Sequence, residues 1–197
     1  MLQAEHANER ANKRANKRAD EHAVRRLALM GGESSGKTTL ARALADALGT
    51  VWVPEYGRQR WEELRETLGV DELVAVAQRQ VALEEDALAR ARGWLVCDTT
   101  PLTTLQYCLH DHGQAPAELS ALARRRYDLT VVCEPDFGFV QDGCRRDDEF
   151  RARQHAWTVQ QLTAMHVRWM AVHGPVSTRL MQVLQVLEAL QAPDSLR

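Results

Sequence analysis

The sequence has no long apolar run and few cysteines. None of its 197 residues belongs to a stretch near the roughly 18 apolar residues that a membrane-spanning helix needs, so a spanning protein is excluded. The N-terminus lacks the apolar segment of a secretory signal, and we expect no secretion. The 4 cysteines are far apart, without a C-x-x-C pair, which argues against a zinc knuckle or a disulfide scaffold. A reducing, cytoplasmic location is the resulting expectation.

Lysine is also scarce. The chain holds 3 Lys against 22 Arg, and after Lys13 and Lys17 the only further lysine is Lys37. The net charge of −2 divides into +3 for residues 1–26 and −5 for residues 27–197. An acidic body argues against nucleic acid as the main partner.

Residues 1–25 differ from the rest of the chain. An alanine recurs at every fourth position from Ala7 to Ala23, and there is almost no apolar surface. We therefore expect a basic tail that is disordered or a frayed helix, or else translated upstream sequence. Its acidic residues disfavour an import presequence. The remaining composition, with 45% apolar residues overall, suits one folded domain, expected over residues 26–192.

Short apolar segments alternate with helical patterns along this domain. Strands are predicted at residues 27–30, 51–53, 94–97, 129–133 and 169–172. Helices are predicted at residues 38–48, 71–92, 102–109, 117–126, 149–166 and 176–190. Such alternation indicates parallel strands buried on both faces. We predict an α/β three-layer sandwich around a five-stranded parallel sheet, with ligands bound at the carboxyl ends of the strands.

The segment between the first strand and the first helix matches G-x-x-x-x-G-K-[ST], the phosphate-binding P-loop. The residues expected to bind ATP are Gly31, Gly32, Glu33, Ser34, Ser35, Gly36, Lys37, Thr38 and Thr39. Glycines let backbone N–H groups surround phosphate oxygens at the start of a helix. Lys37 supplies charge to the β- and γ-phosphates, and Thr38 offers its hydroxyl to Mg²⁺. The retained lysine fits, since a planar guanidinium cannot replace an ammonium in a narrow loop.

Charged residues follow three further predicted strands. Glu55 follows the second strand, Asp98 ends the third, and Arg145 and Arg146 lie in the polar loop after the fourth. Because the carboxyl ends of parallel strands share one edge, we expect these residues to converge on the γ-phosphate. Each also has an ordinary structural explanation: a helix cap for the aspartate, a loop acid for the glutamate, and an exposed charge run for the arginines.

Five segments in sequence carry a resemblance to a known family: GGESSGKTTL, PEYGR, CDTTPLTTLQY, YDLTVVCE and DGCRRDDEFR. Their order and spacing resemble the ribosylnicotinamide kinase domain of the NadR family, a P-loop AAA-like kinase of NAD metabolism. The resemblance spans residues 27–190. It implies transfer of phosphate from ATP to the 5′-hydroxyl of nicotinamide riboside, which gives nicotinamide mononucleotide. Because the chain has 197 residues and no H-x-G-H adenylyltransferase motif, we expect a stand-alone kinase module.

The resemblance implies Mg·ATP-dependent, in-line phosphoryl transfer. The P-loop and its lysine hold the phosphates, while Thr38 and Asp98 hold Mg²⁺, the aspartate directly or through water. Glu55 accepts the proton of the attacking hydroxyl, and the two loop arginines close over the transferring group. The carboxylate roles stay open, because Asp98 could be the base while Glu55 orients the sugar.

Substrate binding is assigned to Glu55, Tyr56 and Arg58 in the PEYGR segment. The nicotinamide ring is planar and cationic, so it favours an aromatic face beside acids. Tyr56 is the first choice for that face, whereas Trp61 and Tyr107 are either within reach of the ring or part of the core.

A mobile lid is predicted over residues 136–148, where Gly138 and Gly143 permit hinge motion. Two other functions stay open: a kinase of another nucleoside or vitamin, and an ATPase switch that moves a partner. No long insertion or repeat suggests a partner surface, so we expect a small-molecule substrate as the main partner. A homo-oligomer is compatible with the sequence.

Overall fold

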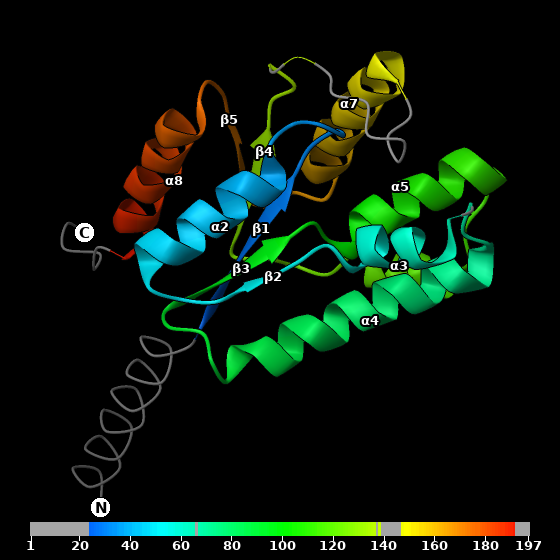
Figure 1. Cartoon of the computed structure of the whole chain (residues 1–197), viewed down its shortest axis with the longest axis horizontal. Coiled ribbons are helices and arrows are strands. Elements are labelled where there is room, and N and C mark those ends of the chain that lie inside the picture. The colour runs from blue at the N-terminus through cyan, green and yellow to red at the C-terminus, as the bar shows by residue number, and fades with distance from the viewer. Residues whose placement is uncertain (1–23, 66, 137, 139–146, 192–197) are drawn as a thin grey trace, which may run out of the picture.

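The structure of the chain is a computed structural model that describes residues 24–65, 67–136, 138 and 147–191 (Figure 1). Its strands are β1 (Arg25–Met30), β2 (Trp52–Val53), β3 (Trp94–Asp98), β4 (Leu129–Cys133) and β5 (Trp169–Val172). Its helices are α2 (Lys37–Leu48), α3 (Tyr56–Leu64), α4 (Val70–Leu88), α5 (Pro101–His112), α6 (Ala117–Leu122), α7 (Asp148–Ala164) and α8 (Val176–Gln191). Most of the predicted tail, residues 1–23, lies outside the described residues.

The five strands form one parallel sheet in the order β2-β3-β1-β4-β5, as predicted. β1 lies at the centre, where Leu27 is in register with Val96 of β3 on one side and with Leu129 of β4 on the other. This order places the carboxyl ends of β2, β3, β1 and β4 beside one another. The P-loop, Glu55 and Asp98 therefore leave the sheet at the same edge.

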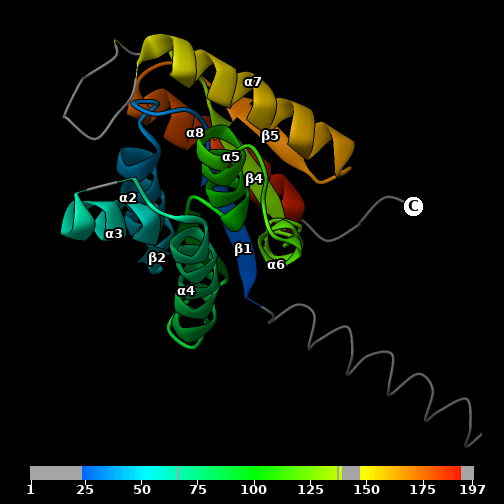
Figure 2. The same ribbon diagram turned by 90° about the vertical axis from the view of Figure 1, so that its right-hand side faces the viewer.

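Helices cover both faces of the sheet, which confirms the three-layer sandwich (Figures 1 and 2). On one face, Leu29 and Val131 pack with Leu44 of α2 and Leu187 of α8. The opposite face is covered by α4, α5 and α7, with α6 packed against α4 and α5. Neighbouring residues of one strand supply the two cores, because side chains of a strand alternate between faces.

The sequence predicts no helix at residues 56–64, yet α3 lies there. None of its residues is buried, so it lacks the apolar stripe that reveals a helix in a sequence. Ion pairs within the helix join Arg58 to Glu62 at 3.2 Å and Arg60 to Glu63 at 3.0 Å. Pairs at these spacings stabilise an exposed helix without any apolar periodicity.

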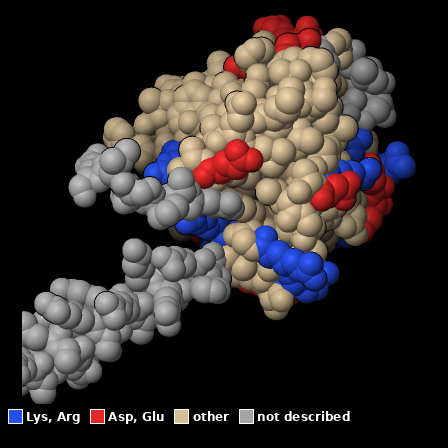
Figure 3. Space-filling view, turned by 90° about the vertical axis from the view of Figure 1, so that its left-hand side faces the viewer, with Lys and Arg blue, Asp and Glu red and all other residues tan. Residues whose placement is uncertain are grey.

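The surface formed by α2 and α8 is largely uncharged (Figure 3). Lys and Arg gather there in small separate groups, and the described residues of this face form no continuous basic surface. None of the helices in the described part of the chain is long and apolar enough to cross a membrane.

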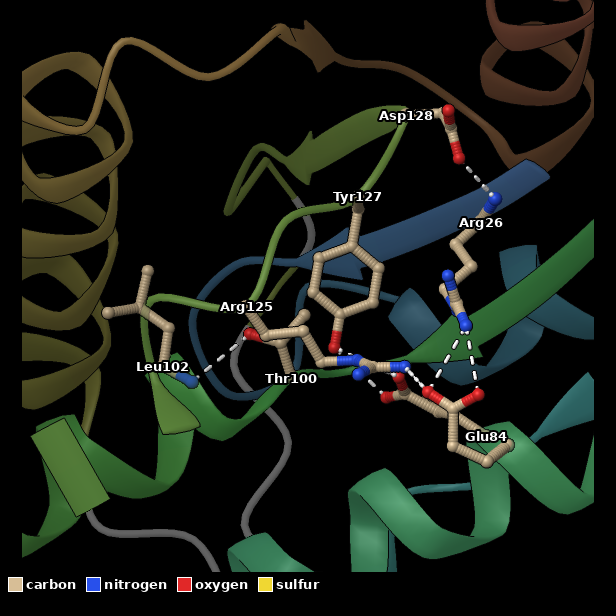
Figure 4. Close-up of polar contacts among 8 residues, drawn as sticks. Arg26, Glu84, Thr100, Leu102, Arg125, Tyr127 and Asp128 are labelled. Atoms are coloured by element: carbon tan, nitrogen blue, oxygen red, sulfur yellow. Dashed lines mark hydrogen bonds and ion pairs between the residues drawn. The ribbon is translucent and has the colours of Figure 1, made fainter. Parts of the chain in front are cut away.

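A buried carboxylate fixes α4 to the segment that precedes β4 (Figure 4). Glu84 of α4 is 0% exposed, and the hydroxyl of Tyr127 donates to its two oxygens at 3.0 and 3.1 Å. Arg125 Nε donates to the same carboxylate at 2.9 Å and also pairs with Glu85, which in turn pairs with Arg26 of β1. Burial raises the pKa of Glu84, and the nearby arginine opposes that effect.

We expect Tyr127→Phe to lower the free energy of unfolding by about 1–3 kcal/mol, because a buried carboxylate loses a donor. For a domain of this size the melting temperature then falls by roughly 2–4 °C per kcal/mol, measurable by circular dichroism. Arg126→Ala is the matched control, since Arg126 is exposed and adjacent. If the two variants have the same melting temperature, the hydroxyl of Tyr127 does not stabilise the buried Glu84 carboxylate.

Candidate active site

The P-loop is so closely surrounded that its first two positions accept only glycine. A Cβ on Gly31 would lie 2.5 Å from the carbonyl oxygen of Cys133, at the end of β4. A Cβ on Gly32 would lie 2.7 Å from Cγ of Arg151 on α7. Gly31 also has a φ of +137°, and Gly36, which precedes α2, has a φ of +79°. These constraints explain the glycines at both ends of the motif.

A buried arginine of α8 bonds to the backbone of the P-loop. Arg179 is 0% exposed and donates from Nη1 to the carbonyl oxygen of Ser35 at 2.6 Å. It also donates to the carbonyl oxygens of Gly174 at 2.8 Å and Glu134 at 2.9 Å. Arg179 is not among the residues predicted from sequence, although an arginine within the apolar pattern of a helix is a visible signal.

The structure brings Lys37, Thr38 and Asp98 together at the ends of β1 and β3. Lys37 Nζ donates to the carbonyl oxygens of Gly31 at 3.1 Å and Gly32 at 2.8 Å. Thr38 Oγ1 donates to Asp98 Oδ2 at 2.6 Å. Asp98 is 1% exposed, and its Oδ1 finds no hydrogen-bond partner among the described residues. Burial raises the pKa of Asp98, while the Thr38 hydroxyl and the Lys37 charge oppose the rise.

Glu55 faces the same group from the end of β2, where it precedes the first turn of α3. Withdrawal from solvent raises the pKa of Glu55, and the positive charge of Lys37 lowers it. The like charges of Asp98 and Glu33 raise the pKa further. Those mutual effects mean that the predicted carboxylates and the lysine share one site.

A cavity of about 250 Å³ opens beside the P-loop. Loop residues Glu33, Ser34, Ser35, Gly36, Lys37, Thr38 and Thr39 line it together with Glu55, Arg58, Trp61, Leu68, Leu73, Val76, Gln80, Tyr107, Asp111 and Gln154. Its walls thus combine apolar and aromatic side chains with a few polar groups, the composition usual for small-molecule sites.

Arg58 lines this cavity, but Tyr56 is not among the lining residues. The backbone N–H of Tyr56 donates to Gln80 Oε1 at 3.0 Å, and its side chain packs with the apolar cluster between α4 and α5. Within the described part of the chain, the aromatic side chains of the cavity wall are Trp61 and Tyr107. Both were secondary choices from the sequence, whereas the first choice, Tyr56, does not line this cavity.

Two contacts of Glu33 link the P-loop to the helices around the cavity. The Glu33 carboxylate accepts a hydrogen bond from the hydroxyl of Tyr107 on α5 at 2.8 Å. Its backbone N–H donates to Oε1 of Gln154 on α7 at 2.9 Å. Gln154 is 2% exposed, and no sequence pattern distinguishes it from the other glutamines of α7.

The predicted lid lies largely outside the described residues, and with it Arg145 and Arg146. The described residues that follow begin α7, where the Asp147 carboxylate accepts a hydrogen bond from the backbone N–H of Phe150 at 2.6 Å. Thr100 caps α5 in the same way, since its Oγ1 accepts from the Leu102 N–H at 3.2 Å (Figure 4). The residue that caps α5 is therefore Thr100, whereas the Asp98 carboxylate accepts its hydrogen bond from Thr38.

The chain resembles NadR in sequence and in structure, as the motifs predict. The trifunctional NAD biosynthesis/regulator protein NadR of Escherichia coli K12 is 32% identical over 130 residues, which are 62% of this chain and 31% of that protein. The chain thus spans about a third of the length of the curated relatives it matches.

Solved structures share the fold. NadR in complex with NR matches 90% of this chain and 54% of its own, with a TM-score of 0.70 and 22% identity. NadR in complex with NAD and AMP-PNP matches 90% of this chain and 52% of its own, with a TM-score of 0.72 and 20% identity. Thymidylate kinase from Ehrlichia chaffeensis matches 84% of this chain and 99% of its own, with a TM-score of 0.62 and 18% identity. The fold is therefore that of P-loop nucleoside kinases.

A family model described as an AAA domain matches residues 26–179, which include the whole P-loop and the strand ends that face it. The chain belongs to this AAA-domain family.

Proposed function

We propose that the chain is a Mg·ATP-dependent kinase that phosphorylates the 5′-hydroxyl of nicotinamide riboside. The observation that carries the proposal is one cavity lined by both a P-loop and a partly buried carboxylate, Glu55. A P-loop supplies the phosphate donor, and a carboxylate beside it supplies a proton acceptor. The similarity to NadR, which has been crystallised with NR, supports this acceptor.

The P-loop residues 31–39 would hold the phosphates of ATP. Backbone N–H groups at the start of α2 and the positive end of that helix attract anions. Lys37 Nζ now contacts two loop carbonyl oxygens, and on binding it would exchange them for the β- and γ-phosphates. Arg145 and Arg146 are proposed to neutralise the transferring group.

Thr38 and Asp98 fit a magnesium site. Mg²⁺ prefers oxygen ligands and is often held by one or two protein oxygens together with phosphates and waters. The buried Asp98 Oδ1 has no partner among the described residues, and Thr38 Oγ1 lies 2.6 Å from Oδ2 of the same carboxylate. Bound there, Mg²⁺ would neutralise charge on the phosphates, while Asp98 would orient the Thr38 hydroxyl.

Glu55 is the proposed proton acceptor, and the walls of the cavity would hold the acceptor's ring. The pKa of Glu55 is raised toward neutral pH, and a general base is most effective when its pKa lies near the working pH. Trp61 and Tyr107 present aromatic faces to a planar cation. Arg58 and Glu55 line the same cavity and are proposed to hold the ribose.

We expect Lys37→Ala to abolish phosphoryl transfer and to leave the melting temperature without ligand nearly unchanged. Lys37 bonds only to two carbonyls of its own loop among the contacts described, so its loss removes charge and not core packing. Steady-state kinetics and thermal unfolding measure both effects. Arg90→Ala removes an exposed cation from the end of α4 as a control. Full activity in folded Lys37→Ala protein would refute the P-loop assignment.

Glu55→Gln and Asp98→Asn are expected to have separable effects. The Gln variant lowers kcat by about 10²-fold or more and keeps the affinity for ATP, because it removes a general base. The Asn variant raises the Mg²⁺ concentration needed for half-maximal activity. Exchanged phenotypes would reverse the two roles.

The pH profile provides an independent test of Glu55. A base must be ionised, so activity falls as the pH drops through the pKa of Glu55, which lies above the ordinary glutamate value of 4.5. Burial has the largest effect on this pKa, followed by the charges of Lys37, Asp98, Arg58 and Glu33. We expect the acidic limb of kcat/KM to lie above pH 4.5 and to disappear in Glu55→Gln. A limb that persists in the variant would belong to another group.

The acceptor is tested by comparing kcat/KM for nicotinamide riboside, uridine, cytidine and thiamine. We expect nicotinamide riboside to exceed the others by at least about tenfold, because one interaction of a charged group is worth that much. A tenfold preference for any of the other three would overturn the acceptor and leave the kinase assignment in place.

A further inference from the structure

We propose that Glu33, the carboxylate inside the P-loop, determines acceptor specificity by favouring a nucleoside with a cationic base. This inference rests on the proposed function and describes its acceptor more closely. It assigns Glu33 to the acceptor side of the cavity, although the motif alone assigns it to ATP.

The contacts of Glu33 tie it to two helices of the cavity wall. A carboxylate among phosphate-binding groups repels the anion that the loop must hold. Glu33 instead accepts a hydrogen bond from Tyr107 Oη at 2.8 Å, and its backbone N–H donates to Gln154 Oε1 at 2.9 Å. Both partners come from helices that line the cavity, so Tyr107 holds the carboxylate and Gln154 holds the backbone of Glu33 in the cavity wall.

The charges around the cavity favour a cation. Glu33, Glu55 and Asp111 line it, opposed by Lys37 and Arg58. When Lys37 binds the phosphates of ATP, the three carboxylates of the cavity wall face only one remaining cation among these residues, Arg58. The Glu33 charge also acts on Glu55, because it is one of the causes that raise the pKa of Glu55. A positively charged base between these groups relieves their repulsion, and an additional phosphate on the acceptor increases it.

Neutral groups of the same wall complete the recognition of a cationic nucleoside. Gln80 lines the cavity, is 2% exposed and accepts the Tyr56 N–H through Oε1 at 3.0 Å. Its Nε2 has no hydrogen-bond partner in the described part of the chain. That donor suits a hydroxyl or carbonyl oxygen of the ligand. Trp61 and Tyr107 add aromatic faces, which attract a planar cation.

The test compares nicotinamide riboside with its reduced dihydro form, which is neutral and nearly the same in shape. Calorimetry measures the binding of each to the full chain in the presence of a non-hydrolysable ATP analogue. We expect the wild type to bind the cationic riboside at least about tenfold more tightly than the neutral one. Glu33→Gln should bring the ratio of the two affinities close to one, because it weakens binding of the cationic riboside alone.

Three further variants test whether the change in preference depends on the charge and position of Glu33. Glu33→Asp keeps the charge but shortens the side chain, so we expect it to retain part of the preference for the cationic riboside. This variant also tests the proposal if Glu33→Gln does not fold. Tyr107→Phe removes the hydroxyl that positions Glu33 and reduces the ratio partially. Asp46→Asn removes an exposed carboxylate of α2 and leaves the wild-type ratio unchanged.

The inference and the proposed function fail separately. If the wild type phosphorylates nicotinamide riboside but folded Glu33→Gln or Glu33→Asp keeps the full wild-type ratio, the role of Glu33 is overturned and the function stands. A wild type that binds the two ribosides equally, or binds neither, also overturns the role of Glu33. If the Glu33-dependent preference is found but no phosphate is transferred, the role of Glu33 stands and the proposed function is overturned.

Discussion

The close contact of the P-loop with β4 and α7 is the constraint on which the site depends. The backbone of Cys133 and the side chain of Arg151 reach the positions where Cβ atoms would lie, so a larger residue than glycine would collide at either position. Arg179 fixes the same loop from α8 through the Ser35 carbonyl oxygen. Three elements from distant parts of the sequence thus fix the P-loop, and such preorganisation would reduce the entropy lost if the loop binds ATP as proposed.

Burial then sets the electrostatics of the groups that face the cradle. Asp98 and Glu55 are held near each other and near Lys37, and withdrawal from solvent raises the pKa of both carboxyls. Burial and the neighbouring like charge both disfavour the ionised form of Glu55. Carboxyls with pKa values raised by burial beside a lysine in a cavity are typical of functional sites, which agrees with the proposed function.

Local sequence patterns were sufficient to predict the sheet and the phosphate cradle. All five strands lie within two residues of their predicted bounds, because each contains a short apolar run that is followed by a glycine, a proline or a polar residue. The P-loop is contiguous, so its spacing alone identifies it. β1 begins two residues earlier than predicted, at Arg25, because charged residues can pair in a strand where its end meets solvent.

Features that depend on distant partners could not be predicted. α3 is stabilised by ion pairs and not by an apolar stripe. Glu84 is buried only because Arg125 and Tyr127, some forty residues later in the chain, satisfy it. The position of Tyr56 also depends on distant partners, since its backbone N–H donates to Gln80 and its side chain packs with the apolar cluster.

The fate of the γ-phosphate of ATP tests the central claim most directly. Phosphorus NMR of the full chain with Mg²⁺, ATP and nicotinamide riboside over many turnovers follows every phosphate at once. The account predicts one nicotinamide mononucleotide for each ADP, with little inorganic phosphate, because the acceptor hydroxyl and not water takes the phosphoryl group. Inorganic phosphate formed in step with ADP, with no phosphorylated riboside, would contradict it and indicate an ATPase.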